Sequence, residues 1–216
     1  MKKIILTSIL IWLAIICKAD YRSIFLPGLI EKSELIAHIK IVKDLNGNFE
    51  AEILNQIKGK INSKKIIVKK FEDWTCAQRW SKYLIGQEEL IFLKKHKKEN
   101  YWVIMGAGNE GEMPIEKEIL YYKSPIYKSK YFEEEKFCEL KNGKITAVKF
   151  ELDIAIEGIK SYLNEIEKIK EKLDNKTLIK FYPKNKFYLR AINEKILSNR
   201  WEFDEAEIEK RKFIKK

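Results

Sequence analysis

The sequence predicts an α+β protein, with a small antiparallel β-barrel followed by a β-hairpin and a C-terminal helical segment packed on it. Three observations predict this fold class. Short runs of alternating apolar residues fill the first half, an Asn-Gly pair separates two later β-rich runs, and the last third carries apolar residues at helical spacing. We expect a leader over residues 1–19, the barrel with its hairpin over 20–150, and the helical extension over 151–216.

The leader has the features of an export signal. Two lysines precede an apolar run over residues 4–16, and Cys17-Lys18-Ala19 then offers small residues for cleavage before Asp20. The run is shorter than the roughly 20 apolar residues that a membrane-spanning helix needs. We therefore expect a secreted or periplasmic protein with no integral membrane span after cleavage. A lipid anchor on Cys17 is one alternative, and a leader that stays uncleaved is another.

The charge of the chain favours an ordinary soluble surface. Lys and Arg number 43 against 32 Asp and Glu, a formal net charge of +11, but most lysines have a glutamate nearby in the sequence. Such mixing differs from the basic stripe of a polyanion-binding protein. We therefore expect no nucleic-acid partner.

Five short β-rich runs make up the expected barrel. The first two alternate apolar and polar residues on either side of Asn46-Gly47, a pair suited to the left-handed conformations of a tight hairpin turn. The other three are rich in apolar, β-branched and aromatic residues. The runs are residues 35–42, 49–53, 66–68, 90–93 and 101–105. Strands this short, mostly with short connections, favour a small closed or nearly closed barrel.

A further hairpin is expected beyond a glycine-rich loop. Residues 106–112 contain three glycines, which predict a long surface loop. Residues 137–141 and 144–150 then flank Asn142-Gly143, and a two-residue turn there sets Leu140 opposite Ile145.

The last third of the chain is expected to be helical. Its apolar residues recur at spacings of three, four and seven, which places them on one helix face. They are Leu152, Ile156, Ile159, Leu163, Ile166 and Leu173. A break over residues 175–183 separates this helix from a shorter amphipathic set over 189–196 and from a terminal helix that begins near Asp204. We expect the long helix to pack on the barrel of its own chain, in a monomer, rather than against a second copy.

Two cysteines follow the leader. Cys76 and Cys138 form an even pair, which in an oxidising compartment is consistent with a disulfide. Closing a loop of this length contributes about 4 kcal/mol on the chain-entropy model. Two separate buried thiols are the alternative.

Part of the first half resembles the netrin-like domain shared with tissue inhibitors of metalloproteinases, in its exported bacterial form. The similarity covers roughly residues 30–112, and the stretches that carry it are residues 51–59 (AEILNQIKG), Trp74-Thr-Cys76 and residues 83–93 (YLIGQEELIFL). The resemblance implies a barrel of the oligonucleotide/oligosaccharide-binding (OB) type. The inhibitory function of that family, which needs a terminal Cys-x-Cys, does not carry over. The expected mature N-terminus, Asp20-Tyr21-Arg22, has no such pair.

Aromatic and cationic side chains are the candidates for binding a partner. Trp74, Arg79, Trp80, Tyr83 and Trp102 are the candidate binding residues, most of them in a loop close to Cys76. The lysines of residues 94–98 suggest a glycan or nucleic-acid surface, of which an exported protein more often meets the glycan.

Loop carboxylates are the candidates for catalysis. Glu110 and Glu112 lie two residues apart beside glycines, so they are candidates for an acid/base pair or a cation site. A structural turn is the simpler reading of this loop. The two histidines, His38 and His96, and the cysteines lack the short spacing of zinc ligands, and no serine lies in a nucleophile-elbow motif. We expect neither a metal nor a cofactor.

These patterns favour an exported, non-enzymatic binding module whose partner is an envelope protein or a glycan. A hydrolase that uses Glu110, Glu112 or His38 is one alternative, and a metalloprotease-inhibitor-like protein is the other.

Overall fold

The computed structural model describes residues 23–74, 77–125, 134–174, 185–195 and 198, with the backbone alone over 167–174. The expected leader, Cys76, the break over 175–183, Ile196 and the terminal helix lie outside these residues.

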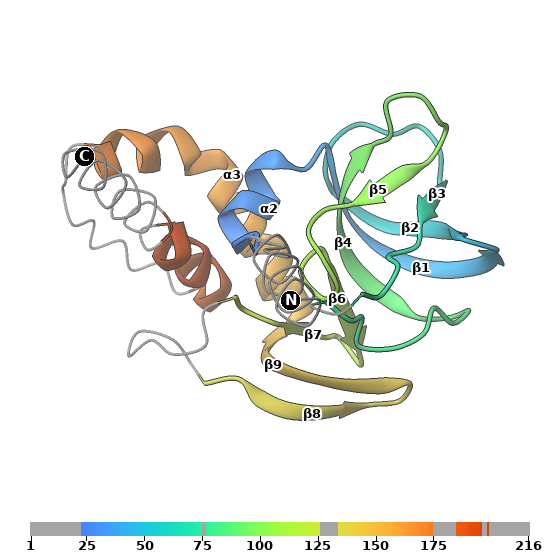
Figure 1. Ribbon diagram of the computed structural model, residues 1–216. Helices are drawn as coiled ribbons and strands as arrows, with labels where there is room; N and C mark the ends of the chain where they lie inside the picture. The colour runs from blue at the N-terminus through green and yellow to red at the C-terminus, as the bar shows by residue number, and fades with distance from the viewer. Residues whose placement is uncertain (1–22, 75–76, 126–133, 175–184, 196–197, 199–216) are drawn as a thin grey trace, which may run out of the picture.

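Five strands close a barrel (Figure 1, right). β1 pairs with β2 on one side and with β4 on the other, so the order β1-β2-β3-β5-β4 returns to β1. The strands are β1 (Leu35–Leu45), β2 (Asn48–Lys58), β3 (Lys65–Lys69), β4 (Glu88–Lys95) and β5 (Trp102–Ile104). Each overlaps one of the five predicted runs, and the predicted OB-like α+β fold is confirmed.

One strand pair differs from the wholly antiparallel barrel expected from the sequence. β3 and β5 run parallel and pair only through Val68–Trp102 and Lys69–Val103. Parallel neighbours need a crossover connection, and here residues 70–101, which include β4, supply it. Because the two strands share only two residue pairs, the seam between them is short.

The hairpin turn between β1 and β2 forms at Asn46-Gly47 as predicted. Both residues have a positive φ, 33° at Asn46 and 87° at Gly47, and Leu45 faces Asn48 across the turn. These are the left-handed conformations that such a turn requires.

β1 and β4 are buried on both faces. One face of each strand points into the barrel, and the other contributes to a second apolar cluster shared with the helices. The barrel cluster contains Leu35, Ala37, Ile39, Ile91 and Leu93, and the second cluster contains Ile36, Leu90 and Phe92. The alternation of side chains along a strand therefore supplies both cores from the same two strands.

The sheet extends beyond the barrel. β4 pairs with β6, and the order continues β6-β7-β9-β8, along the lower edge of Figure 1. These strands are β6 (Glu112–Glu116), β7 (Ile119–Tyr122), β8 (Lys136–Leu140) and β9 (Gly143–Glu151).

The expected surface loop over residues 106–112 is shorter and more buried than predicted. β6 begins at Glu112, whose side chain is wholly buried. Gly108 and Gly111 lie where another backbone segment approaches closely. A Cβ on Gly111 would lie 2.0 Å from Met105 O, and one on Gly108 would lie 2.8 Å from Gln78 O. The prediction failed because glycine marks irregular backbone without saying whether that backbone is exposed.

The β8–β9 hairpin forms, but its register differs from the prediction. Leu140 faces Gly143 and Cys138 faces Ile145, so the predicted pairing of Leu140 with Ile145 is wrong. Glycine is needed at position 143 because the Trp80 backbone packs against it, and a Cβ there would lie 2.2 Å from Trp80 O. Gly143 is therefore the first residue of β9 and lies under the β3–β4 connection, rather than in the turn.

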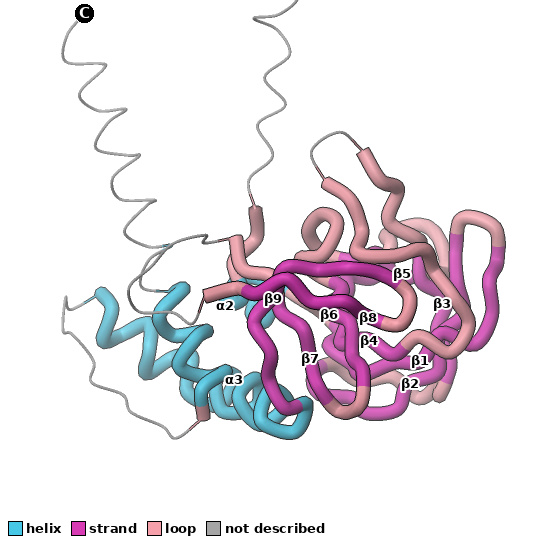
Figure 2. Tube along the Cα trace, turned by 90° about the horizontal axis from the view of Figure 1, so that it is seen from below, coloured by secondary structure: helices cyan, strands magenta, loops and turns pink. Residues whose placement is uncertain are grey.

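The described helices gather on one side of the barrel (Figures 1 and 2). They are α2 (Leu26–Lys32), α3 (Leu152–Asp174) and a helix over residues 186–195. The predicted face of α3 packs inward, with Leu152 and Ile159 buried and Ile156, Leu163 and Ile166 partly buried against the second cluster. None of the described helices is both long enough and apolar enough to cross a membrane.

Cys138 is a free, buried thiol in this structure. Its S–H group lies 3.3 Å from Lys136 O, to which it donates a hydrogen bond. The predicted disulfide with Cys76 is therefore not formed here, and Cys138 packs as a small apolar side chain in a cluster with Leu140 and Ile145.

Candidate functional site

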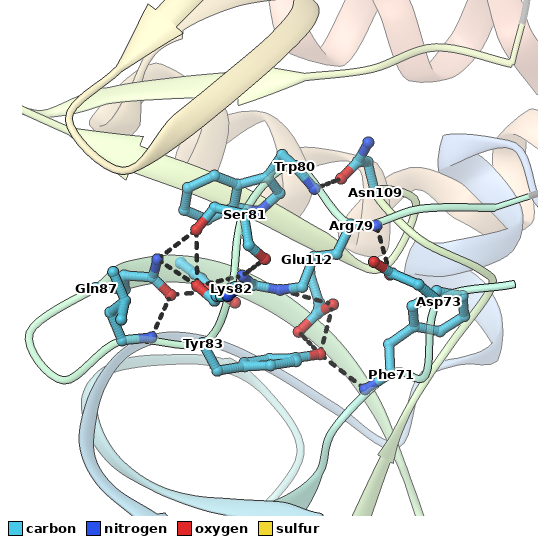
Figure 3. A network of polar contacts seen from close by, with 12 residues as sticks. Phe71, Asp73, Arg79, Trp80, Ser81, Lys82, Tyr83, Gln87, Asn109 and Glu112 are labelled. Carbon is cyan, nitrogen blue, oxygen red and sulfur yellow. Dashed lines mark hydrogen bonds and ion pairs between the residues drawn. The ribbon is translucent and has the colours of Figure 1, made fainter.

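Arg79 is the centre of a buried polar network in the long β3–β4 connection (Figure 3). Its guanidinium Cζ lies 4.6 Å from the ring centroid of Trp80 and 3.9 Å from that of Tyr83. It also forms ion pairs with Glu89 of β4 and Glu112 of β6, with 3.3 Å between Arg79 Nε and Glu112 Oε2. The side chains of all three charged residues are at most 2% exposed.

Two carboxylates share one guanidinium in this network, so a fully ionised cluster would bury an excess negative charge. Burial raises the pKa of Glu112 to about 8; the Glu89 carboxylate adds to this rise and Arg79 opposes it. Burial also raises the pKa of Glu89. The raised pKa values of the two carboxyls favour one retained proton in the cluster at neutral pH, which balances its charge.

Side-chain to backbone hydrogen bonds fix the shape of the connection around Arg79. Asp73 Oδ1 accepts the Arg79 N–H at 2.8 Å, and Asn109 Oδ1 accepts the Trp80 N–H at 2.7 Å (Figure 3). The Tyr83 hydroxyl donates to Glu112 Oε1 at 2.8 Å and accepts the Phe71 N–H at the same distance. These contacts hold the connection against β4 and β6.

The network is an interior feature of the protein. Arg79 and Trp80 are each 8% exposed, and Tyr83 is half-buried with its ring stacked on Phe49 at 5.1 Å. Trp74 lies in the same connection, where it forms an isolated bridge with Ala77. The structure thus brings Arg79, Trp80 and Tyr83 together, but as a structural cluster that holds the connection in place.

The residues proposed for catalysis have separate partners. Glu110 Oε2 accepts the N–H groups of Ile24 and Ala107, at 3.3 and 3.1 Å, and Glu112 belongs to the Arg79 network. His38 lies on β1, where its Nε2 is 3.2 Å from Glu88 Oε2. Glu110 also lines a small hollow of about 120 Å³ with Asn109 and Ser124. No described contact joins the three predicted catalytic residues to one another.

An open hollow of about 450 Å³ lies beside the short seam between β3 and β5. We call it the seam pocket, and the lining residues used below are Glu50, Ile61, Lys65, Lys95, Asn100 and Trp102. It exists because β3 begins at Lys65 but pairs with β5 only from Val68 onward. The first residues of β3 therefore have no β5 neighbour, and the two strands diverge around the hollow.

Trp102 is the aromatic residue of the seam pocket. It is half-buried, and it packs against the barrel core as well as lining the hollow. Lys95 lies across the strand pair from it, with Nζ 5.2 Å from the indole centroid and 2.9 Å from Asn100 Oδ1. Packing against the core and this contact fix the ring in place before any ligand arrives.

Charged groups from β2 and β3 also line the pocket. Lys65 Nζ lies 2.9 Å from Glu50 Oε1, and this hydrogen bond raises the pKa of Lys65. The pocket thus combines an aromatic surface, two ammonium groups, a carboxylate and an amide, which are groups that hold and orient a ligand.

Of the five predicted binding residues, Trp102 lines the seam pocket and the other four lie in the β3–β4 connection. Sequence reasoning missed Glu50, Lys65 and Asn100. The alternation of the second run indicated that Glu50 points away from the barrel core, but the meeting of β3 with β5 depends on barrel closure.

Within the described part of the chain, no group of three or more His, Cys, Asp or Glu side chains is placed to hold a metal ion. The sequence matches no protein-family model, and no curated protein matches it as a relative. The resemblance to netrin-like domains stays a prediction.

Proposed function

We propose that the protein is an exported, non-enzymatic binding module of the cell envelope, which holds a protein or glycan partner at the seam pocket. The observation that carries the proposal is the position of Trp102. A half-buried indole in an open pocket, fixed by the barrel core and surrounded by polar groups, is typical of a binding site. OB-type barrels commonly bind ligands on the face around their second and third strands.

The partners of the other candidates favour binding over catalysis. Glu112 is wholly buried and bonded to Arg79 and Tyr83, while Glu110 accepts two backbone N–H groups. A general acid or base has to reach its substrate. These contacts instead give the two carboxylates a role in holding the loop and β6 in place.

The export part of the proposal depends on the leader. A positive start, an apolar run over residues 4–16 and small residues before Asp20 support cleavage after Ala19. Mass spectrometry of the mature protein tests it. A first residue at Asp20 is the expected result, whereas a diacyl or triacyl mass on Cys17 supports the lipid-anchored alternative and a mass that includes residues 1–19 excludes cleavage.

Crosslinking in intact cells tests the binding role. We expect the wild-type protein to give a specific crosslinked protein or glycan, and Trp102→Ala to lose it. Phe137→Ala is the matched control, because Phe137 is an aromatic residue that is 63% exposed on β8 and does not line the pocket. Equal yields from wild type and Trp102→Ala, or no adduct from any variant, would contradict the proposal.

A further inference from the structure

The two segments that border the seam pocket carry a local excess of positive charge. From residue 53 to residue 71 the chain has six lysines and no acidic residue, and residues 94–98 add four more lysines. The β2–β3 connection and the β4–β5 hairpin belong to these segments, and both contribute to the pocket lining. Barrel closure therefore brings two lysine-rich segments, which are separate in the sequence, to the same pocket.

Most of these lysines have no ion pair within the described part of the chain. Lys58 donates to the carbonyls of Ile30 and Glu31, and Lys70 pairs with Asp44 at 2.6 Å. Lys65 pairs with Glu50, which leaves the bordering segments with a positive surplus. This surplus of positive charge favours an anionic ligand. Because the site is exposed, salt screens the attraction.

The shape of the lining favours a ring with apolar and polar faces. The indole of Trp102 and the aliphatic side chain of Ile61 supply apolar contact. Glu50 and Asn100 supply a carboxylate and an amide, which accept and donate hydrogen bonds to hydroxyl groups. A sugar ring presents carbon-bound hydrogens on its face and hydroxyl groups at its edge, so it matches both kinds of group.

The Glu50 carboxylate also separates a saccharide from a nucleic acid. A carboxylate repels every anionic group, but a sugar ring can place a hydroxyl beside Glu50, which accepts its hydrogen bond, and direct its own acid group toward Lys65 and Lys95. A nucleic acid carries a phosphodiester at each nucleotide and has fewer hydroxyl groups to offer the carboxylate. Single-stranded nucleic acids are also bound through several stacking aromatics along a basic groove. Trp102 is the one aromatic side chain that lines the seam pocket as described here.

We propose that the seam pocket binds an acidic saccharide chain, with Trp102 stacking on one sugar ring, Glu50 and Asn100 bonding its hydroxyls, and Lys65 and Lys95 attracting its carboxylates. This inference rests on the proposed binding function and names the ligand class of the same site.

A matched pair of ligands tests the inference. Binding of the purified protein to a galacturonic-acid oligosaccharide and to its methyl ester is measured by calorimetry at low and at physiological salt. The two ligands share their sugar rings and differ in charge. We expect the ester to bind about tenfold more weakly, a difference of about 1.4 kcal/mol, and the acid to lose affinity as salt rises.

Variants place the binding in the pocket. We expect Trp102→Ala to weaken acid binding about tenfold and Lys95→Gln about threefold, since exposed charges contribute less than a stacked ring. Phe137→Ala on β8 and Lys149→Gln on β9 are controls, with exposed side chains outside the pocket, and should leave the affinity unchanged. Because Trp102 also packs on the core, a thermal melt accompanies its variant, and the exposed Lys95 provides the independent test.

The outcomes separate this inference from the proposed function. If the acid and its ester bind equally, and Trp102→Ala loses both, the pocket binds saccharides but the preference for an acidic saccharide is overturned. A Trp102-dependent protein crosslink with no binding to either sugar keeps the binding role and overturns the saccharide. Tighter binding of single-stranded oligo(dT), or acid binding that both pocket variants leave unchanged, overturns the inference as well.

Discussion

At the scale of single residues, Glu112 shows how burial changes the chemistry of an ordinary glutamate. It belongs to a stretch of sequence that reads as a solvent-exposed glycine loop, yet it lies in the interior beside Arg79 and Glu89. One guanidinium cannot neutralise two ionised carboxylates, so burial and the neighbouring Glu89 hold the pKa of Glu112 above its ordinary value. The residue acts in holding the β3–β4 connection to β6.

Replacing Glu112 with Gln is expected to change how stability depends on pH. In the folded protein burial raises the pKa of Glu112 to about 8, whereas the unfolded chain releases this proton near the ordinary value of 4.5. Between these values the folded state binds more protons, so this residue makes the free energy of unfolding fall as pH rises from about 4.5 to about 8. Glu112→Gln removes this fall, and between pH 5 and pH 8 we expect the wild type to lose about 3–4 kcal/mol more than the variant.

Urea unfolding at pH 5, 6.5 and 8 measures this difference. Glu99→Gln is the control, because Glu99 is exposed at the β4–β5 hairpin and should not alter the profile. Parallel profiles for the wild type and Glu112→Gln would show that Glu112 is already ionised across this range.

At the scale of elements, Glu194 ties the helices to the sheet. Its carboxylate accepts the Leu26 N–H at 3.0 Å, the Tyr122 hydroxyl at 2.8 Å and Arg190 Nε at 2.7 Å. These partners belong to α2, to β7 and to the helix over 186–195. One buried carboxylate therefore joins three elements that are far apart in the sequence.

Glu194→Ala is expected to destabilise the protein by about 3–5 kcal/mol, because it removes one partner of a buried ion pair and the acceptor of hydrogen bonds from Leu26, Tyr122 and Ser124. Denaturant unfolding followed by circular dichroism measures the change. Glu157→Ala is the matched control, a helical glutamate with an exposed side chain, for which about 0.5 kcal/mol or less is expected. A similar small effect for both variants would mean that Glu194 does not tie these elements together.

Sequence patterns predicted some turns and helices correctly and others wrongly. The Asn46-Gly47 turn and the helix over Leu152–Asp174 follow from φ preferences and apolar spacing, which act within a few residues. The second Asn-Gly pair gave the wrong register, because Gly143 accommodates the backbone of Trp80. α2 was missed, since its seven residues include a proline and a glycine that weaken any helical pattern.

At the scale of the whole molecule, the helices complete the hydrophobic core. Ile36 and Phe92 of the barrel share one cluster with Ile159 and Tyr162 of α3 and with Phe187 of the following helix. The outer faces of β1 and β4 are therefore covered by the part of the chain that follows residue 151.

A chain of residues 20–150 is expected not to fold cooperatively. It lacks several large buried side chains, each of which contributes about 1.5–3 kcal/mol, and their sum approaches the 5–15 kcal/mol that stabilises a typical domain. Thermal unfolding followed by circular dichroism, with the dispersion of amide proton shifts, compares it with the full chain. A sharp transition near the melting temperature of the full chain would instead show that the barrel is stable alone.

The candidate site was predicted only in part. Trp102 and the lysines of residues 94–98 stood out in the sequence. Glu50 and Lys65 did not, because they belong to β2 and β3, and only the pairing of β3 with β5 brings them to the same pocket as Trp102. Arg79, Trp80 and Tyr83 stood out as a binding loop and lie in a mostly buried network instead. Residue type shows which chemistry is available, but burial decides whether a ligand can reach it.

By itself, the sequence determined the strands of the barrel, the first hairpin turn and the long helix, because periodicity and turn preferences act between neighbours along the chain. The parallel seam, the register of the second hairpin, the free thiol of Cys138 and the raised pKa of Glu112 follow only from the tertiary structure. Each of these depends on contacts between segments that are distant in sequence. The seam pocket has the same origin, since it opens where two strands brought together by barrel closure diverge.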